Sequence, residues 1–279
     1  MTVPPELVAQ LRGFAEEIAV EAGTLSLTGP RAVTDTKSSP TDVVTATDRA
    51  VEDLLRARIA AARPDDAVLG EEGGFDGGGG RVGEGLTWVL DPIDGTVNFL
   101  YGQPQYAVSV AVVTGDPRVP GAWQPVAACV HQPVGGLSWT AGRGQGATLD
   151  GEPLAVRAPV DLAQALVATG FGYRADRRAG QARVLTGVVP AVRDIRRAGS
   201  AALDLCWVAT GRLDAYYERG VNVWDIAAAA LVLTEAGGVV TGLRGAPAGP
   251  EMTVAGPGPV AAALAGLLAE LDADTDPQR

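Results

Sequence analysis

The sequence contains few of the side chains that carry covalent or redox chemistry. Its 279 residues include two cysteines and one histidine. Cys129 and Cys206 lie far apart and belong to no metal-binding motif, which disfavours a disulfide scaffold or a zinc site. His131 has no serine or carboxylate motif beside it. A Ser-His-Asp triad and phosphoryl transfer through histidine are therefore disfavoured, and His131 is predicted to be structural.

Positive charge is also scarce. The chain has 22 Lys and Arg against 33 Asp and Glu, a net charge of −11, so general nucleic-acid binding and attraction to an acidic membrane surface are not expected. An anionic substrate would need cations to offset the local repulsion. No run approaches 18 uninterrupted apolar residues, and the N-terminus carries acids but no apolar signal segment. We therefore expect a cytoplasmic protein without a membrane span.

Several common phosphate and metal motifs are missing. The chain has no GxxxxGK[ST] loop, no CxxxxxR phosphatase loop, and no EF-hand pattern of alternating acids closed by a glutamate. Nucleotide hydrolysis on a P-loop, cysteine-based phosphatase chemistry and an EF-hand are excluded on this basis.

Apolar periodicity predicts alternating groups of helices and strands. Helices are expected over 5–25, from about 48 onward, and over 176–188, 200–211, 223–237 and 259–271. Strands are expected at 67–70, 87–91, 106–114, 126–133, 137–141, 165–170, 192–196, 213–218 and 252–256. The polar segment 31–47 reads as a hairpin or flap, 142–154 as a further hairpin, and glycine-rich 73–85 as an exposed loop. These patterns predict an α+β fold of packed helix and sheet layers.

The segment WVLDPIDGTVNF at 88–99 ends an apolar strand with two aspartates. Asp91 and Asp94 repel each other where the strand leaves the core, so a cation between them is expected. Residues three apart on a regular strand point to opposite faces, and Pro92 would start the turn that brings the two together. With the carbonyl of Ile93, they offer oxygen ligands suited to Mg²⁺.

Gly95 and Thr96 follow at an expected helix start, where backbone N–H groups can hold a phosphate. The simpler alternative is an ordinary Asp-Gly turn with a capping threonine. That alternative does not account for the second aspartate.

Other carboxylates also stand at the ends of regular elements. Glu71 and Glu72 follow a short strand, Asp48 lies where a helix begins, and Asp225 falls in the first turn of a very apolar helix. Helix capping is the alternative role for Asp48 and Asp225, since a carboxylate favours the N-terminal end of the helix dipole.

Four segments together resemble the inositol monophosphatase family, and most of all its bacterial inositol-1-monophosphatases. They are GEE at 70–72, WVLDPIDGTVNF at 88–99, the stretch 196–218 and AYYERGVNVWDIAAAA at 215–230. The resemblance extends over nearly the whole chain. It implies a layered α/β/α/β/α sandwich of the inositol monophosphatase and sugar phosphatase type. It also implies use of Mg²⁺, inhibition by lithium and a homodimer. The chain would form one catalytic domain, 1–279, of two tightly fused subdomains at roughly 1–150 and 151–279.

The resemblance also implies a ligand set and a substrate site. The first metal would be held by Glu71, Asp91 and the carbonyl of Ile93, the second by Asp91, Asp94 and Asp225, and a third, weaker ion through water on Glu71. Glu71 and Thr96, the latter supported by Asp48, would position the attacking water. Lys37 would lie on a flap near the metals. The implied substrate contacts are Asp94, Gly95, Thr96, Ser200, Ala201, Glu218 and Asp225.

The sequence thus predicts a Mg²⁺-dependent phosphate monoester hydrolase acting on myo-inositol 1-phosphate or a similar polyol phosphate. Metal-assisted attack by water needs no covalent nucleophile, in keeping with the scarcity of His and Cys. Alternatives within the fold act on histidinol phosphate, fructose 1,6-bisphosphate or 3′-phosphoadenosine nucleotides. Val223, where nucleotide phosphatases tend to carry an acid, and the GSAA pattern at 199–202 favour inositol phosphate. An alternative of another class is a non-catalytic regulatory binding protein.

Overall fold

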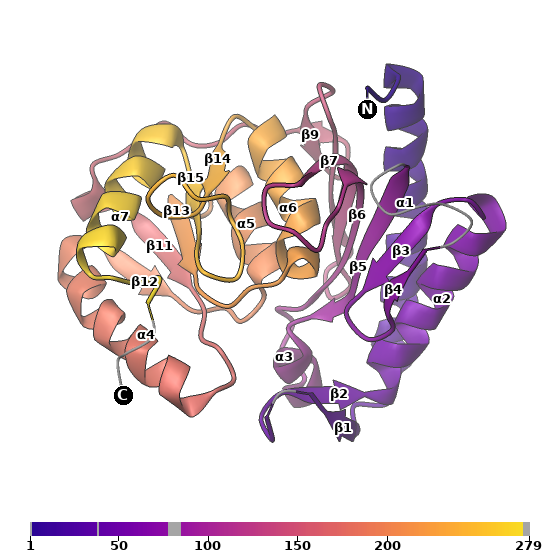
Figure 1. The fold of residues 1–279 in the computed structure, drawn as a ribbon, viewed down its shortest axis with the longest axis horizontal. Helices are drawn as coiled ribbons and strands as arrows, with labels where there is room; N and C mark the ends of the chain where they lie inside the picture. The colour runs from indigo at the N-terminus through magenta and orange to yellow at the C-terminus, as the bar shows by residue number, and fades with distance from the viewer. Residues whose placement is uncertain (1, 38, 78–84, 276–279) are drawn as a thin grey trace.

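Helices and sheets alternate in five layers in the computed structural model, which describes residues 2–37, 39–77 and 85–275 (Figure 1). The layers are two helices, a large sheet, two central helices, a smaller sheet and two further helices. The predicted α+β sandwich is confirmed. Within the described ranges, none of the helices combines the length and apolar character that crossing a bilayer requires.

The large sheet has eight strands in the order β10-β9-β8-β7-β6-β5-β3-β4. Its strands are β3 (Ala67–Gly70), β4 (Gly74–Asp76), β5 (Leu86–Asp94), β6 (Ala107–Gly115), β7 (Trp123–Gln132), β8 (Leu137–Gly142), β9 (Ala147–Leu149) and β10 (Glu152–Pro153). All neighbouring pairs are antiparallel except β3 and β5. Helices α1 (Pro5–Thr28) and α2 (Ala46–Ala62) cover its outer face (Figure 1). Their apolar stripes pack on Trp88, Leu90 and Val110, so burial holds this layer in place.

The smaller sheet has five strands in the order β12-β11-β13-β15-β14. They are β11 (Leu166–Thr169), β12 (Asp194–Arg196), β13 (Ala215–Glu218), β14 (Val239–Thr241) and β15 (Thr253–Gly256). The first three strands of that order run parallel and the remaining neighbours antiparallel. Helices α4 (Ala175–Val188) and α7 (Gly258–Glu270) pack on its outer face, and short 3₁₀ turns lie at Leu162–Gln164 and Val189–Ala191.

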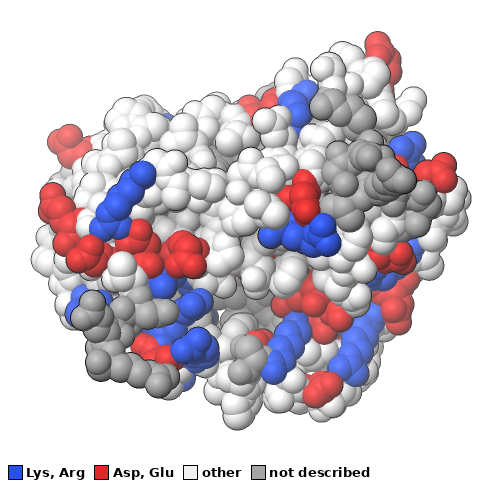
Figure 2. Space-filling view, viewed as in Figure 1, with Lys and Arg blue, Asp and Glu red and all other residues white. Residues whose placement is uncertain are grey.

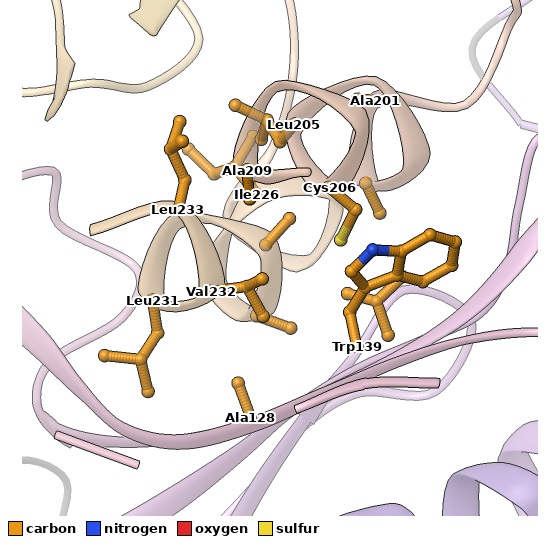
Figure 3. Close-up of a cluster of buried hydrophobic side chains, with 14 of the residues drawn as sticks. Ala128, Trp139, Ala201, Leu205, Cys206, Ala209, Ile226, Leu231, Val232 and Leu233 are labelled. Atoms are coloured by element: carbon orange, nitrogen blue, oxygen red, sulfur yellow. The ribbon is translucent and has the colours of Figure 1, made fainter. Parts of the chain in front are cut away.

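The central layer consists of α5 (Ala201–Ala209) and α6 (Val223–Glu235), which are apolar on nearly all sides because both sheets pack on them. Figure 3 shows side chains of both helices, including Cys206 and Val232, converging with Trp139 and Ala128 of the large sheet. This dense packing fixes the N-terminal ends of α5 and α6, which reach the candidate site.

The predicted helices and hairpins are confirmed, including the hairpin of β1 (Val33–Thr36) and β2 (Val43–Thr45). Two details of the strand prediction were wrong. The strand expected to stop at 91 continues through Asp94. Part of the expected loop 73–85 is β4, which pairs with β3 and forms the edge of the large sheet. Residues 78–84 of that loop lie outside the described residues. The short strand β14 was not predicted.

His131 lies in β7, is 6% exposed, and shares a 2.9 Å hydrogen bond between its Nδ1 and Ser138 Oγ. This is the structural role expected. The division into one domain of two fused subdomains stays a prediction.

Candidate active site

Asp91 and Asp94 are brought to the same side of β5 by an irregularity in its pairing with β6. Asp91 pairs with Ser109 and Asp94 with Ala107, so three steps along β5 match two along β6. One extra residue of this kind is a β-bulge, and it cancels the alternation that would otherwise point the aspartates to opposite faces. Proline cannot donate a backbone hydrogen bond to a neighbouring strand, and a bulge is a position where that hydrogen bond is not needed, so Pro92 fits here. The Ile93 N–H donates to Asp91 Oδ1 at 3.0 Å, which fixes that carboxylate.

Asp225 reaches the same point from the first turn of α6. Ligand oxygens of Asp91, Asp94 and Asp225 all lie within 4.8 Å of one another. Asp225 Oδ2 accepts the Asn222 N–H at 2.6 Å, within a capping box in which the Asn222 side chain also accepts from the helix. Capping and membership of the carboxylate trio therefore coexist, since the cap uses one of the two oxygens.

The trio is short of positive charge. Burial raises the pKa of Asp91 well above its usual range, and the charges of Glu71, Asp94 and Asp225 raise it further. Burial and the charges of Glu71 and Asp94 act in the same direction on the pKa of Asp225. Burial also raises the pKa of Asp94, to about 6. Oxygen donors that are destabilised as anions in this way fit a hard divalent cation, which would restore their charged form.

Glu71 lies beside the trio and pairs with a lysine. Lys37 Nζ is 2.7 Å from Glu71 Oε1 and 2.5 Å from Glu72 Oε1. Burial acts to lower the pKa of Lys37, but the two carboxylates outweigh it and raise that pKa. Burial also raises the pKa of Glu71, and Lys37 opposes this. The flap lysine expected from the sequence therefore supplies local positive charge to Glu71.

A residue that the sequence did not single out, Glu52, shapes the turn that carries Glu71. Its buried carboxylate on α2 accepts the N–H groups of Glu72 and Gly73, each at 2.8 Å, and binds Arg56 Nε at 2.7 Å. In the sequence, Glu52 and Arg56 are four residues apart on a predicted helix, and ion pairs with this spacing usually lie on the solvent-exposed face. That spacing alone therefore does not indicate a buried role for Glu52.

Thr96 is held by two acceptors. Its Oγ1 lies 3.1 Å from Asp48 Oδ1 and 3.1 Å from the carbonyl of Ile93. Asp48 is fully buried, the third residue of α2, where Thr45 is the N-cap and donates its N–H to Asp48 Oδ2 at 2.9 Å. With its proton committed to either acceptor, the Thr96 oxygen can accept a hydrogen bond from a third group.

The glycine between Asp94 and Thr96 is required by the backbone. Gly95 has φ +97°, and a Cβ there would lie 2.9 Å from the Gln105 carbonyl and 3.1 Å from that of Gly199. It is the N-cap of α3 (Thr96–Tyr101). Three backbone segments come so close together here that only glycine fits at position 95.

The N-terminus of α5 anchors Asp94. Ser200 Oγ donates to Asp94 Oδ2 at 2.6 Å and the Ala202 N–H donates to the same oxygen at 2.7 Å. Ser200 is also the N-cap of α5, accepting the Leu203 N–H at 3.2 Å. The expected substrate residues Ser200 and Ala201 therefore lie against the carboxylate trio.

Glu218 lies at the end of β13 on the wall of the same cavity. Tyr216 OH donates to its Oε2 at 3.0 Å, and burial raises the pKa of Glu218 to about 7. The cavity has a volume of about 460 Å³ and opens between the two sheets. Its wall also includes Arg177 and Arg197. The sequence analysis did not single out either one, although Arg197 lies in the stretch 196–218 that carries part of the resemblance.

Comparison with known proteins assigns the chain to a family. A family model described as the inositol monophosphatase family matches residues 7–275. Inositol-1-monophosphatase SuhB of Mycobacterium tuberculosis (strain ATCC 25618 / H37Rv) is 46% identical over 96% of each chain. The solved structure of Mycobacterium tuberculosis SuhB has a TM-score of 0.78 at 43% identity and covers 96% of this chain and 98% of its own. The Nus factor SuhB of Pseudomonas aeruginosa is 42% identical over 73% of each chain.

Proposed function

The chain belongs to the inositol monophosphatase family, and from that membership we propose that it is a Mg²⁺-dependent phosphate monoester hydrolase acting on myo-inositol 1-phosphate. Phosphatase activity follows from the family; the metal and the substrate are the proposal. The observation that carries it is the trio Asp91, Asp94 and Asp225, with oxygens within 4.8 Å of one another on the wall of a cavity large enough for a polyol phosphate.

The donor set suits Mg²⁺ because every member is an oxygen. Asp91, Asp94 and Asp225 would hold the ions together with Glu71 and the Ile93 carbonyl. When bound, the ions supply the positive charge that lets a phosphate dianion approach these carboxylates and that offsets charge on the attacking and leaving oxygens.

Thr96 and Glu71 position the attacking water. The Thr96 hydroxyl donates toward Asp48 or the Ile93 carbonyl, so its oxygen accepts a hydrogen bond from one O–H of the water. The Glu71 carboxylate accepts a hydrogen bond from the other O–H, which directs a lone pair of the water at phosphorus. The amides of Gly95 and Thr96 donate to the phosphate oxygens.

The polyol part of the substrate lies on the side of the cavity that Glu218 lines. Glu218 accepts a hydrogen bond from a substrate hydroxyl, and Tyr216 holds its carboxylate in place. Ala201 at the start of α5 limits the space beside the reacting phosphate, and the buried Ser200 supports this position by holding Asp94. Inhibition by lithium, a homodimer and a cytoplasmic location stay predictions from the resemblance.

A substrate panel tests the proposal. Phosphate release at fixed Mg²⁺ is measured with myo-inositol 1-phosphate, histidinol phosphate, fructose 1,6-bisphosphate and 3′-phosphoadenosine 5′-phosphate. We expect the highest kcat/KM with the inositol ester and almost none in Asp91→Asn. The matched control is Asp116→Asn, at a surface turn where Asp116 pairs with Arg118. A tenfold preference for another ester would refute the substrate, and no release from any ester would refute the function.

A second candidate is a regulatory binding role, favoured by the similarity to the protein from P. aeruginosa that is called a Nus factor. The two roles respond differently to loss of one carboxylate. A cellular role that rests on hydrolysis disappears in Asp91→Asn, whereas a role that rests on binding alone survives in that variant.

A further inference from the structure

On the side that Glu218 lines, the cavity is bounded by two segments that leave the smaller sheet next to each other. Strands β11 and β13 pair in parallel as far as Thr169 and Tyr217, where their register ends. The chain continues as residues 170–174 after β11 and as 218–221 at the end of β13, and residues of both segments line the cavity. Where paired strands separate, their backbone N–H and C=O groups need other partners. The side chains that supply these partners set how far apart the two segments lie.

Gln181 of α4 supplies partners to both segments. Its Oε1 accepts the Gly172 N–H at 2.9 Å, and its Nε2 donates to the carbonyl of Arg219 at 3.1 Å. A longer contact of 3.5 Å joins the same Nε2 to the Gly170 carbonyl. One end of the amide thus faces a donor and the other end faces two acceptors, which fixes its orientation. The side chain is a bridge between the two segments.

The bridge lies behind the cavity wall and does not belong to it. Basic side chains gather over α4 in the lower part of the face that Figure 2 shows, and the helix contains several arginines. Gln181 is a neutral residue of this helix and is half-buried. With Gly170 and Tyr217 it lines a small gap on the far side of the wall. Gln181 can therefore act on a bound substrate only through the segments that it holds.

Glu218 depends on this bridge from two directions. Arg219, whose carbonyl Gln181 binds, is the next residue in the chain. From the other segment, a Cβ at Gly170 would lie 2.0 Å from Glu218 Oε2, so the Gly170 backbone packs directly against the carboxylate. A change in the separation of the two segments therefore moves this carboxylate or opens a gap beside it.

Other contacts hold the rest of the cavity. Tyr173, at the far end of the first segment, has its carbonyl bound by Arg178 Nη1 at 2.6 Å and by Thr41 Oγ1 at 3.0 Å. Asp94 is held from the N-terminus of α5. Loss of the Gln181 amide should therefore leave the carboxylate trio and the β1–β2 hairpin in place.

From these contacts we propose that Gln181 is a positioning residue for substrate specificity, because its amide sets the separation between residues 170–172 and Glu218. This rests on the proposed function, since it takes Glu218 as the acceptor of a hydroxyl of the polyol. Gln181 acts through Glu218 and does not reach the reacting phosphate. Its loss weakens binding of the polyol and leaves the chemical step unchanged.

The test compares Gln181→Met with the parent on myo-inositol 1-phosphate and on 4-nitrophenyl phosphate. Methionine keeps the length of the side chain and removes its hydrogen bonds, and the aryl ester carries no hydroxyl that Glu218 could accept from. We expect KM for the inositol ester to rise about tenfold, the scale of one hydrogen bond, with kcat unchanged. Both constants for the aryl ester should stay close to those of the parent.

Gln145→Met is the matched control, because the Gln145 amide also donates to a backbone carbonyl, that of Pro5, at 2.7 Å and away from the cavity wall. Parent-like constants on both esters in Gln181→Met would overturn the proposal. A rise in KM of equal size on both esters, or a loss in kcat without a rise in KM, would also overturn it. If Gln181→Met melts below the assay temperature, Gln181→Glu takes its place with the same outcomes, since it keeps the acceptor for the Gly172 N–H and loses the donor to Arg219.

If the parent does not hydrolyse the inositol ester, the proposed function fails, and thermal melting with Mg²⁺ and myo-inositol 1-phosphate decides the positioning role alone. A rise in Tm of the parent that is smaller in Gln181→Met supports the role. Equal rises in the two proteins, or no rise in the parent, overturn it.

Discussion

Asp225→Asn separates the two roles that the structure gives to this side chain. The aspartate caps α6 through the Asn222 N–H and belongs to the carboxylate trio. Asparagine can accept the same N–H, so the cap should survive. The negative charge is lost, and burial with the charges of Glu71 and Asp94 disfavours that charge in the metal-free protein. Without metal, the variant should therefore be as stable as the parent or more stable.

Mg²⁺ should reverse this order. A ligand at a hundred times its Kd stabilises the folded state by about 2.7 kcal/mol. For a chain of 279 residues that corresponds to a rise in Tm of roughly 5 °C. Asp225→Asn lacks one ligand and should gain less than half of that rise. Turnover should fall about 10²- to 10³-fold, the scale for loss of one preorganised electrostatic contact.

The assay is a Mg²⁺ titration of phosphate release together with thermal melting in chelator and in Mg²⁺, for the parent and Asp225→Asn. Asp161→Asn is a matched control, because Asp161 precedes the 3₁₀ turn at Leu162–Gln164, away from the cavity wall. Parent-like turnover with an unchanged Mg²⁺ curve would refute the reasoning and leave Asp225 as a cap only. A variant that melts much earlier than the parent in chelator would refute the charge argument.

Three further predictions concern other parts of the chain. Glu71→Gln should lower kcat by about 10²- to 10³-fold with little change in KM, since Glu71 acts on the water; steady-state kinetics test this, and a rate within a few-fold of the parent would remove Glu71 from the role. A Cβ at Gly23 would overlap the ring of His131, so Gly23→Ala should lower the free energy of unfolding despite the better helix propensity of alanine. In denaturant unfolding, Gly23→Ala should become stabilising when it is combined with His131→Ala, because the ring is then absent. If Gly23→Ala destabilises the protein equally with and without His131, the overlap with the His131 ring is excluded as the cause. Burial lowers the pKa of His131 below its ordinary value of 6.5. The unfolded chain therefore binds the proton more readily than the folded protein. The contribution of His131 to the free energy of unfolding is thus present above pH 6.5 and is lost as the pH falls below it. The difference in unfolding free energy between parent and His131→Gln should shrink as the pH falls below 6.5, and a constant difference would contradict the assignment.

Local sequence signals were enough for the layers and for part of the site. Apolar periodicity predicted the helices, and the charged end of an apolar strand drew attention to Asp91 and Asp94. How these two converge could not be read from the sequence, because the bulge depends on the register between β5 and β6. The strand was therefore predicted to end at 91, three residues before its actual end.

Contacts between residues far apart in the chain also could not be predicted from the sequence. Glu52 reads as a solvated partner of Arg56, and only the packing of α2 against the large sheet places its carboxylate under the turn of Glu71. Arg177 and Arg197 lie in segments that contain several arginines, of which Arg174 and Arg196 pair with an acid. Which of them face a cavity depends on how α4 and α5 pack against the smaller sheet.

The most direct test of the account is phosphate release from myo-inositol 1-phosphate by the unmodified protein, first in excess chelator and then during Mg²⁺ readdition. A cluster of buried carboxylates with raised pKa values needs cations before a phosphate dianion can approach it. The account predicts no turnover in chelator and its full return with Mg²⁺. Undiminished turnover in excess chelator would contradict it.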